Sequence, residues 1–552
     1  MAAEKELQSS AAAPVDNNNN NMASLANDGL AAQQAIVNER GMSLRDTLRL
    51  WPKAILFSFF LSLCIIMEGY DTNLMSNFYA YPAFKNHYGN QVDPDGGMLV
   101  SATWQTAITN STQAGSIIGL IINGIVTEWI GFKKSMIFFM VFLIGAVFIP
   151  FFSTGLPMFV AAGIIQGIPW GVFQTLAVTY AADICPVHLR TYMTSWINMC
   201  WVIGILLSSG ILRGLMSIEG QWGYRIPFAL QWIWPLPIIG VTLLAPESPW
   251  WLVRKGRLDE ARAAVLQIVN LDAGIPFDVD AHMEMMQATN QLEIEISTGT
   301  HYWDCFRGSD LRRTEISSIT WVVQALCGVP FMSYATQFLV QAGLDSQDAY
   351  SLNVGKDGLQ LFGCICAWYI MTHVGRRTMY LYGLVVMFVI LVVVGCIGIP
   401  VENEARSWAI GSLLIVMLFF FQLSLGPACY SLVAEMPSTR LRTKTVALAR
   451  AAYNIAGLAT GFLMPQMIGR NAWNWGAKTA FFWAGITLLC GIWVFFRLPE
   501  PKGLTYAELD LLFEHRVSAR KFGPEAASQF AVELNMAGEK TDGAGAHHAE
   551  QV

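Results

Sequence analysis

Ala54-Ile-Leu-Phe-Ser-Phe-Phe-Leu-Ser-Leu-Cys-Ile-Ile-Met67 is followed at once by Glu68-Gly-Tyr-Asp71. The first segment is almost wholly apolar, and the second adds two carboxylates spaced to share one face of a helix. A carboxylate inside a membrane costs on the order of 3 kcal/mol on insertion scales, and such acids usually serve a function. We therefore predict a membrane helix whose Glu68 and Asp71 lie on a proton or substrate path. The alternative places both acids at the membrane interface.

The composition of the whole chain indicates a membrane protein with many spans. Of 552 residues, 54% are hydrophobic and only 13% are charged, whereas about a quarter of the residues in a soluble chain are charged. The formal net charge of −6 argues against a nucleic acid partner. Most of the ten cysteines, Cys64, Cys200 and Cys364 among them, lie in apolar runs. We assign them to packing and expect neither a disulfide framework nor a metal site.

Twelve apolar segments approach the roughly 20 residues that a helix needs to cross a bilayer. They form two sets of six, separated by a charged segment at 246–314 and flanked by polar tails at 1–53 and 497–552. The predicted fold is an all-α membrane protein of twelve transmembrane helices, with one six-helix half at 54–245 and another at 315–496. The N-terminal tail is predicted to be disordered apart from a short helix near Ser43–Leu50, and the central segment is predicted to form short helices. The spans cover 54–74, 99–124, 135–152, 157–181, 191–212, 226–245, 315–341, 353–371, 379–399, 408–433, 446–468 and 477–496.

The basic residues predict the orientation of the spans, because Lys and Arg concentrate in cytoplasmic loops. If the spans alternate, one side receives both tails, the central segment and the loops with Lys133, Lys134, Arg190, Arg376, Arg377, Arg440 and Arg442. We assign that side, and with it both termini, to the cytoplasm. The loops assigned to the opposite side carry Asp93, Asp95, Asp345, Asp357, Glu402 and Glu404.

Two sequence features recur once in each half of the chain. Gly131-Phe-Lys-Lys134 follows the second span, and Gly375-Arg-Arg377 follows the eighth. An acid with an Arg seven residues later follows the fourth span and again the tenth, as Asp183 with Arg190 and Glu435 with Arg442. This recurrence predicts duplication of a six-span unit. Such a duplication is the architecture of the major facilitator transporters, whose binding site lies at the interface of the repeats.

We interpret the repeated charges as ion pairs that hold a cytoplasmic gate shut and break when the two halves rock. They are assigned a conformational task, not contact with the substrate. The residues assigned to this gate are Glu128, Lys133, Asp183, Arg190, Arg376, Glu435 and Arg442.

Further motifs make the chain resemble the sugar porters of the major facilitator superfamily over roughly residues 50–520. They are Gly69-Tyr-Asp71, Gly131-Phe-Lys-Lys134, Pro246-Glu-Ser-Pro249, Gly375-Arg-Arg377, Gly426-Pro427, Glu435 and Pro499-Glu-Pro-Lys-Gly503. Within that family the chain looks most like the fungal α-glucoside, or maltose-type, permeases. The stretches that carry this closer likeness are Glu68-Gly-Tyr-Asp71, Phe78-Tyr-Ala-Tyr-Pro-Ala-Phe84, Gln341-Ala-Gly-Leu344 and Tyr430-Ser-Leu-Val-Ala-Glu435.

The resemblance implies that Glu68 and Asp71 couple transport to protons. In proton-coupled members the acid of the Gly-Tyr-Asp stretch is the proton site, and the maltose-type branch has a second acid three residues earlier. That branch also has an acid in span 2 where this chain has Ser116, and the wider family has an Arg in span 4 where it has Gly163. Arg450 in span 11 is the expected counter-ion of both acids. The alternative is an Arg whose side chain extends to the membrane interface.

The resemblance also indicates candidate sugar ligands, since amides and hydroxyls bind sugar hydroxyls and aromatic rings cover the C–H faces of the ring. The family's second Gln of span 7 is Ala325 here, its Asn is Pro330, and its span 10 Trp is Tyr430. These departures suit a roomier pocket than a monosaccharide needs. For every candidate the alternative is a hydrogen bond between helices. The candidates are Asn198, Gln324, Tyr334, Tyr430 and Asn454, with Gln166 and Gln174 as weaker ones.

The leading hypothesis is a plasma-membrane transporter that imports α-glucosides together with protons by alternating access. We expect a monomer whose partners are the sugar, the proton and the lipid bilayer. No cofactor is expected. The chain has no phosphate-binding Gly-x-x-x-x-Gly-Lys-Ser/Thr loop, so ATP is not expected to drive transport. One alternative keeps the fold but carries a hexose, a polyol or another small metabolite, and a second is a sugar sensor that does not transport. An enzyme is not expected, because no nucleophile–base pair or metal cluster is apparent.

Overall fold

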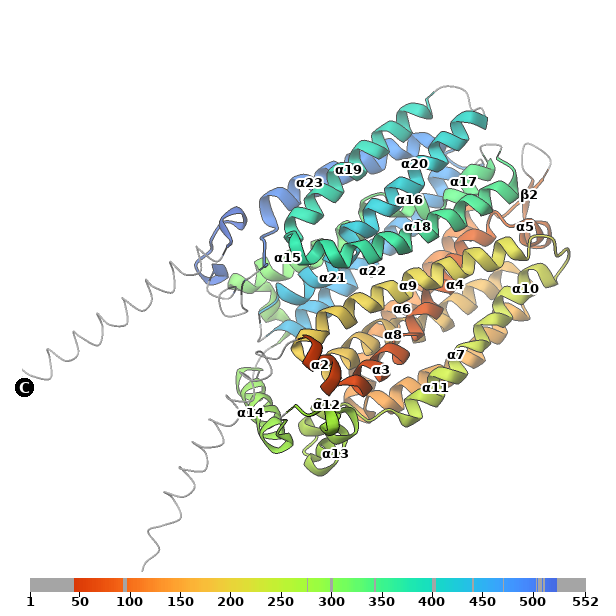
Figure 1. Ribbon diagram of the computed structural model, residues 1–552. Coiled ribbons are helices and arrows are strands. Elements are labelled where there is room, and N and C mark those ends of the chain that lie inside the picture. The colour runs from red at the N-terminus through yellow and green to blue at the C-terminus, as the bar shows by residue number, and fades with distance from the viewer. Residues whose placement is uncertain are drawn as a thin grey trace, which may run out of the picture.

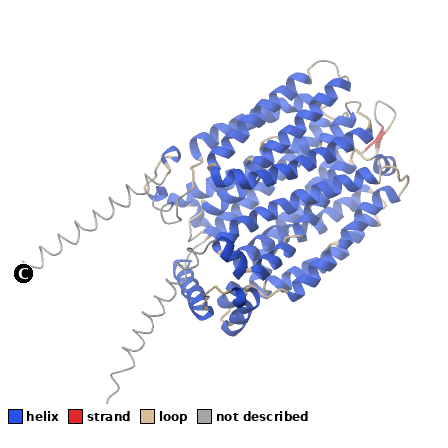
Figure 2. Cartoon of the chain, viewed as in Figure 1, coloured by secondary structure: helices blue, strands red, loops and turns tan. Residues whose placement is uncertain are grey.

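The computed structural model describes residues 44–523, except for 93–96, 276, 298–300, 342–343, 400–403, 439–440, 470, 503, 505–508 and 510–511. Within that part the chain is almost entirely helical, as Figure 2 shows. The predictions for the tails beyond these limits, for Asp93, Asp95, Glu402 and Arg440, and for the side chain of Glu404 lie outside what is described.

The first half of the bundle contains six spans, drawn from red to yellow-green in Figure 1. The 29-residue helices α6 and α8 are each about 44 Å long at 1.5 Å per residue, more than the roughly 30 Å hydrocarbon core of a bilayer. The spans are α3 (Pro52–Leu61) with α4 (Cys64–Phe78), α6 (Ala102–Ile130), α7 (Phe132–Phe151), α8 (Leu156–Ile184), α9 (Val187–Gly214), and α10 (Trp222–Ala229) with η1 (Leu230–Ile233) and α11 (Pro235–Leu244).

The second half repeats this plan, and its spans run from green to blue in Figure 1. The first of them breaks at Gly328, whose φ of +92° is a left-handed conformation that favours glycine. The two halves meet where α22 packs on α6 and α18 packs on α9. The spans are α15 (Gly308–Leu326) with α16 (Val329–Ser333) and α17 (Ala335–Gln341), α18 (Ser346–His373), α19 (Arg376–Ile397), α20 (Glu404–Leu423) with α21 (Leu425–Glu435), α22 (Arg442–Ile468), and η4 (Gly476–Lys478) with α23 (Thr479–Arg497).

Short elements cover the two ends of the bundle, which we name the α14 end and the α5 end (Figure 1). The α5 end carries α5 (Pro82–Tyr88) and the antiparallel pair β1 (Gln91–Val92) and β2 (Met98–Leu99), with Gln91 opposite Leu99. The α14 end carries α2 (Leu44–Leu50), α12 (Pro249–Arg254), α13 (Leu258–Ile268), η2 (Leu271–Ala273), α14 (Val279–Ser297), η3 (Tyr302–Phe306) and η5 (Ala519–Lys521).

The twelve predicted spans correspond to twelve long helical stretches in the described residues. Eleven of them are long and apolar enough to cross a membrane by composition alone. The twelfth is α18, which has 28 residues and carries Asp348, Lys356 and Asp357. The assignment of Asp357 to a loop is therefore wrong: it lies in the fourth turn of α18, and its side chain is fully buried.

Small residues let α6 and α8 pack backbone against backbone. A Cβ at Gly115 would lie 2.3 Å from the carbonyl oxygen of Ile164, so no larger residue fits without moving a helix. This is the small-xxx-small pattern of membrane helix packing, and it fixes the position of α8, which supplies side chains to the site described below. The glycines recur every four residues, at 115 and 119 on α6 and at 163, 167 and 171 on α8.

Each half begins its third span in the same way, which is a structural trace of the duplication. Glu247 accepts hydrogen bonds from the first two N–H groups of α7, at 2.9 and 3.2 Å. Glu500 accepts from the first two N–H groups of α19, at 2.9 and 3.0 Å. The free N–H groups at a helix start favour such an anion, although burial raises the pKa of Glu247 above its ordinary value. A Cβ at Gly131 or Gly375 would lie 2.5 or 2.1 Å from these carboxylates, which explains why Gly precedes the basic residues in both motifs.

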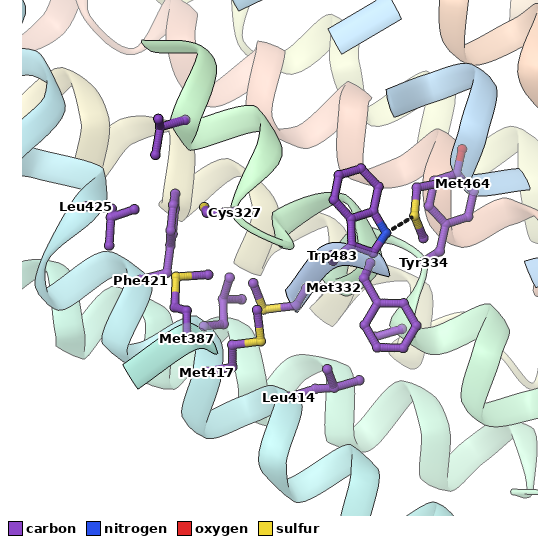
Figure 3. Close-up of a cluster of buried hydrophobic side chains, with 14 of the residues drawn as sticks. Cys327, Met332, Tyr334, Met387, Leu414, Met417, Phe421, Leu425, Met464 and Trp483 are labelled. Atoms are coloured by element: carbon purple, nitrogen blue, oxygen red, sulfur yellow. Dashed lines mark hydrogen bonds between the residues drawn. The ribbon is translucent and has the colours of Figure 1, made fainter. Parts of the chain in front are cut away.

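The core of the second half is rich in methionine and aromatic side chains (Figure 3). Fully buried Trp483 donates its indole N–H to Sδ of Met464 at 3.1 Å. Flexible methionine side chains fill irregular spaces in a core, and Met417 does so beside the break in span 7. There, a Cβ at Gly328 would come within 2.8 Å of Met417.

A buried polar network joins the two halves at the α5 end. Ser209 on α9 donates its hydroxyl to Asp357 Oδ2 on α18 at 2.5 Å. The same hydroxyl oxygen accepts from Asn73 on α4 at 2.9 Å and from Asn353 on α18 at 2.8 Å. Asn353 also donates to Oδ1 of Asn77 at 3.2 Å. Helices α4 and α9 belong to the first half and α18 to the second, so these bonds hold the α5 end closed.

Lys356 supplies the positive charge beside this network. Its Nζ lies 3.2 Å from Asp357 Oδ1, and both side chains are almost completely buried. The two residues are neighbours on α18, so the ion pair moves with the second half, whereas the bond from Ser209 must break if the halves separate.

Replacing Asp357 by Asn should lower the thermal stability of the purified protein, because Ser209 keeps an acceptor while Lys356 keeps a buried charge without its partner. Removing one member of a buried ion pair typically costs about 3–5 kcal/mol, whereas replacing both members is often neutral. We therefore expect a Lys356→Met/Asp357→Asn double variant to unfold close to the native temperature. Equal losses in the single and double variants would show that the ion pair is not what stabilises this region.

Candidate functional site

Glu68 and Asp71 lie on α4 in the interior of the bundle. Only 6% and 3% of their surfaces are exposed. Helix α9 lies directly against this part of α4, because Gly69 has no side chain: a Cβ there would lie 2.3 Å from the carbonyl oxygen of Trp201. Both carboxylates therefore lie inside the protein, away from its outer surface.

Asp71 is held by two neutral donors from its own half. The indole N–H of Trp170 on α8 donates to Oδ2 at 3.2 Å, and Nε2 of Gln231 on η1 donates to Oδ1 at 2.7 Å. Both donors are about 1% exposed. Among the described side chains, no Lys, Arg or His nitrogen lies within 4.0 Å of the carboxylate. Asp71 therefore depends on dipoles, not on a counter-ion.

Glu68 is connected to the other half of the protein through a single amide. Gln174 on α8 donates Nε2 to Glu68 Oε1 at 2.5 Å and accepts from Nε of Arg450 on α22 at 3.0 Å. The guanidinium of Arg450 lies over the rings of Trp321 and Tyr453, 4.7 and 4.8 Å from their centroids. Cation–π contacts of this kind offset part of the burial of a cation. Arg450 thus points into the bundle and not toward the membrane interface, the alternative raised by its sequence position.

The observed partners of the two acids differ from those predicted from the sequence. Arg450, predicted as counter-ion of both acids, approaches only Glu68, and does so through Gln174. Gln174 was a weaker sugar candidate, and Trp170 and Gln231 were not predicted at all. An amide in an otherwise apolar span was a visible signal for Gln231, but its pairing with Asp71 across 160 residues is set by the tertiary fold.

The two positions at which the family pattern has a charged residue and this chain does not, Ser116 and Gly163, lie in close contacts within the first half. The hydroxyl of Ser116 donates to the carbonyl oxygen of Thr112 on its own helix at 3.0 Å. Gly163 faces α6 so closely that a Cβ would lie 2.1 Å from Oγ of Ser111. A larger side chain at this position would force α6 and α8 apart.

Two of the five predicted sugar ligands lie around Trp321 on α15. Gln324, one turn further along the same helix, donates to the carbonyl oxygen of Gly426 at 3.1 Å. Tyr430 on α21 meets the Trp321 ring edge-on, with centroids 4.8 Å apart. Since Arg450 covers Trp321, these residues and the Glu68 connection belong to one region.

Two more predicted ligands bridge the halves. The hydroxyl of Tyr334, between α16 and α17, lies 3.2 Å from Oγ1 of Thr109 on α6. Asn198 on α9 donates to Oε1 of Gln422 on α20 at 3.4 Å. In this conformation both side chains make hydrogen bonds between helices, which is the alternative to sugar binding named above for these residues.

Asn454 on α22 is different. Within the described part of the chain neither its amide oxygen nor its amide nitrogen has a hydrogen-bond partner, although the residue is only 1% exposed. An unpaired buried polar group typically costs about 1–3 kcal/mol. Several such groups in one bundle indicate side chains reserved for a polar ligand or for water. Other side chains with at least one buried, unpaired polar atom include Thr106, Asn110, Gln166, Gln337 and Gln360.

The residues assigned to a gate lie at the α14 end, where the described ion pairs do not join one six-helix half to the other. Lys133 was expected in an ion pair, but its Nζ instead donates to the carbonyl oxygens of Leu243 and Ala245 at 2.7 and 3.0 Å. The side chains of Arg190 and Arg442 lie outside what the structure describes. The pairs formed by the other gate residues are Arg376 with Glu435 at 3.3 Å, Glu128 with Lys255 at 3.3 Å, and Asp183 with Arg254 at 4.0 Å.

Comparison with known proteins identifies relatives along most of the chain. Residues 57–513 match the family described as "Sugar (and other) transporter". The "General alpha-glucoside permease" of Saccharomyces cerevisiae is 38% identical over 504 residues, which are 90% of this chain and 81% of the permease. "Maltose permease MAL61" of Saccharomyces cerevisiae is 37% identical over 522 residues, 93% of this chain and 85% of that protein.

Solved structures with a similar fold include the major facilitator proton:xylose symporter XylE bound to 6-bromo-6-deoxy-D-glucose. It superimposes with a TM-score of 0.68 at 20% identity, covering 84% of this chain and 99% of XylE. The inward-open conformation of XylE from E. coli gives a TM-score of 0.65 at 21% identity, covering 83% and 99%. With the family match over residues 57–513, the chain belongs to the sugar (and other) transporter family and has the major facilitator fold.

Proposed function

We propose that this protein imports α-glucosides across the plasma membrane together with protons, by alternating access. The observation that carries the proton part is the pair of acids on α4, buried in the bundle and linked to the second half through Gln174 and Arg450. The substrate class is supported by the relatives, which are named α-glucoside and maltose permeases. The basic loops at the α14 end support a cytoplasmic location for that end, and the transporter acts as a monomer.

The connection between Glu68 and Arg450 suits a coupling device, because it crosses from one half to the other. Gln174 and Glu68 belong to the first half, and Arg450 belongs to the second, so separation of the halves stretches the 3.0 Å bond between Gln174 and Arg450. A charged Glu68 attracts Arg450 and opposes that separation. A protonated Glu68 does not, so proton binding and release bias the same two-state movement.

Sugar binding acts on the same movement through the unpaired amides. In the present conformation the α5 end is closed by the Ser209 network, and Asn454 has no partner. A sugar hydroxyl that satisfies Asn454 would stabilise the state in which both halves contact the sugar. A ligand shifts such an equilibrium only by its difference in affinity for the two states.

The first test is uptake of labelled maltose, trehalose, sucrose and glucose into cells that lack their own carriers, with and without a protonophore. A potential of about 100 mV is worth about 2.3 kcal/mol per charge, so coupling to one proton supports roughly fifty-fold accumulation. We expect the protonophore and Asp71→Asn each to abolish accumulation of a disaccharide. Uptake insensitive to both would exclude symport, and uptake of glucose alone would favour the hexose facilitator. No uptake by a correctly localised protein would favour the sensor.

Replacing Gln174 by Leu should separate coupling from translocation, because it removes both hydrogen bonds between Glu68 and Arg450 while keeping a side chain of similar size. We expect accumulation to fall at least about tenfold, while exchange of sugar down its gradient persists. Gln267→Leu is the matched control, since that amide bonds only to a carbonyl at the α14 end. If accumulation and exchange fell in parallel, Gln174 would be a packing residue.

Replacing Asn454 by Leu should weaken sugar binding without destabilising the protein. The variant removes two unpaired buried groups, each worth about 1–3 kcal/mol of destabilisation, so thermal stability should stay level or rise. The KM for the transported sugar should rise about tenfold or more, because the ligand loses an amide partner. A normal KM combined with lower stability would indicate a structural Asn.

A further inference from the structure

The two groups that hold Asp71 differ in what they can do when the acid gains a proton. An indole N–H can only donate, whereas a glutamine amide can donate through nitrogen and accept through oxygen. Trp170 donates to Oδ2 and Gln231 donates to Oδ1. The amide oxygen of Gln231 is buried and has no hydrogen-bond partner among the described residues. One unused acceptor therefore belongs to the side chain that already contacts Oδ1 of Asp71.

We propose that Gln231 is a positioning residue that supports Asp71 in both its charged and its protonated form. This inference rests on the proposed role of Asp71 in proton symport. In the charged form, Nε2–H of Gln231 donates to Oδ1, as observed. In the protonated form, the amide turns about its terminal bond, and its Oε1 accepts the new O–H of Asp71.

The proton is directed to one oxygen by the fixed donor on the other. Because Trp170 occupies Oδ2 with an N–H in either state, a proton at Oδ2 would leave two donors facing each other. A hydronium ion therefore gives its proton to Oδ1: one of its O–H bonds breaks, the Oδ1–H bond forms, and a neutral water is left. On release the Oδ1–H bond breaks and the proton returns to a water molecule. Two hydrogen bonds to Asp71 are present before and after the transfer.

Among the described residues, no charged side chain takes the place of Trp170 and Gln231 as a partner of Asp71. On α4 itself, Glu68 is bound to Gln174, and the hydroxyl of Tyr70 donates to the carbonyl oxygen of Pro227 at 2.8 Å. The side chains that α8 presents to the site, Trp170 and Gln174, do not titrate. On α9 the thiol of Cys200 interacts with that of Cys64, and on α10 the guanidinium of Arg225 lies over the Phe151 ring.

The local fold holds the amide in place. Gln231 lies on η1, the short 3-10 segment that separates α10 from α11, with Pro227 before it and Pro235 after it. The hydrogen bond from Tyr70 to Pro227 ties this segment to α4 close to Asp71. This break between two helices thus places the Gln231 amide beside the Asp71 carboxylate. The other residues of η1 are Leu230, Trp232 and Ile233.

The test is infrared difference spectroscopy of the purified full-length protein in lipid membranes, titrated with pH. The carboxylic acid C=O band of Asp71 is identified by its loss in Asp71→Asn. In Gln231→Leu we expect this band to shift in frequency, because the acid O–H has lost its acceptor. The pH at which the band is half lost should rise by about one unit, since a hydrogen bond to a charged carboxylate is roughly twice as strong as one to a neutral acid.

Three further variants serve as comparisons for Gln231→Leu. Trp170→Phe should move the titration to higher pH but leave the O–H acceptor in place, whereas Gln105→Leu and Trp483→Phe, which alter other buried donors, should change neither property. An Asp71 band that is identical in the native protein and in Gln231→Leu would overturn the inference, even if uptake proves sensitive to a protonophore. A band that responds as expected with protonophore-insensitive uptake would refute symport but support the role of Gln231. Absence of any Asp71 band at every pH would overturn both.

Discussion

The free energy of a charge inside a membrane is the constraint on which this structure depends. A buried ion without compensation is strongly unfavourable. The part of the chain that the structure describes buries three carboxylates in its spans and compensates each differently. Asp71 is surrounded by neutral donors, Glu68 reaches a distant cation through an amide, and Asp357 has a lysine beside it in the sequence. The three solutions differ in how easily they change. The neighbouring pair on α18 is permanent, the amide connection depends on the position of the two halves, and the dipoles around Asp71 can follow its protonation.

The duplicated framework contrasts with the unequal distribution of charge upon it. Both halves begin their third span at a glycine and cap it with a later acid, Glu247 or Glu500. The two acids of the proposed proton path nevertheless both lie in the first half, whereas Arg450 lies in the second. A symmetric scaffold supplies two rigid bodies that can move against each other. The asymmetric charges make that movement depend on protonation.

Much of the fold could be predicted from sequence, because the membrane requires long apolar helices and the repeated motifs reveal the duplication. Helix α18 shows the limit of that reasoning: Asp357 was assigned to a loop, whereas the fold buries it against α9. For the site, Glu68, Asp71 and Arg450 were predictable as costly charges in apolar spans. Their actual partners were not, because Trp170, Gln174 and Gln231 are neutral residues whose role depends on contacts across many tens of residues. The bonds from the starts of α7 and α19 to Glu247 and Glu500 could not be predicted either, because they join residues more than 100 positions apart in the sequence.

The hydroxyl of Ser209 has a consequence for the leakiness of the transporter. One oxygen accepts from Asn73 and Asn353 while its hydrogen is donated to Asp357, so the three bonds share a single atom and cannot be lost one at a time without weakening the others. Such mutual dependence makes the closure of the α5 end cooperative. Intermediate openings, through which water or ions could slip without a sugar, are then sparsely populated. A single serine thus contributes to the tightness of the barrier as well as to its strength.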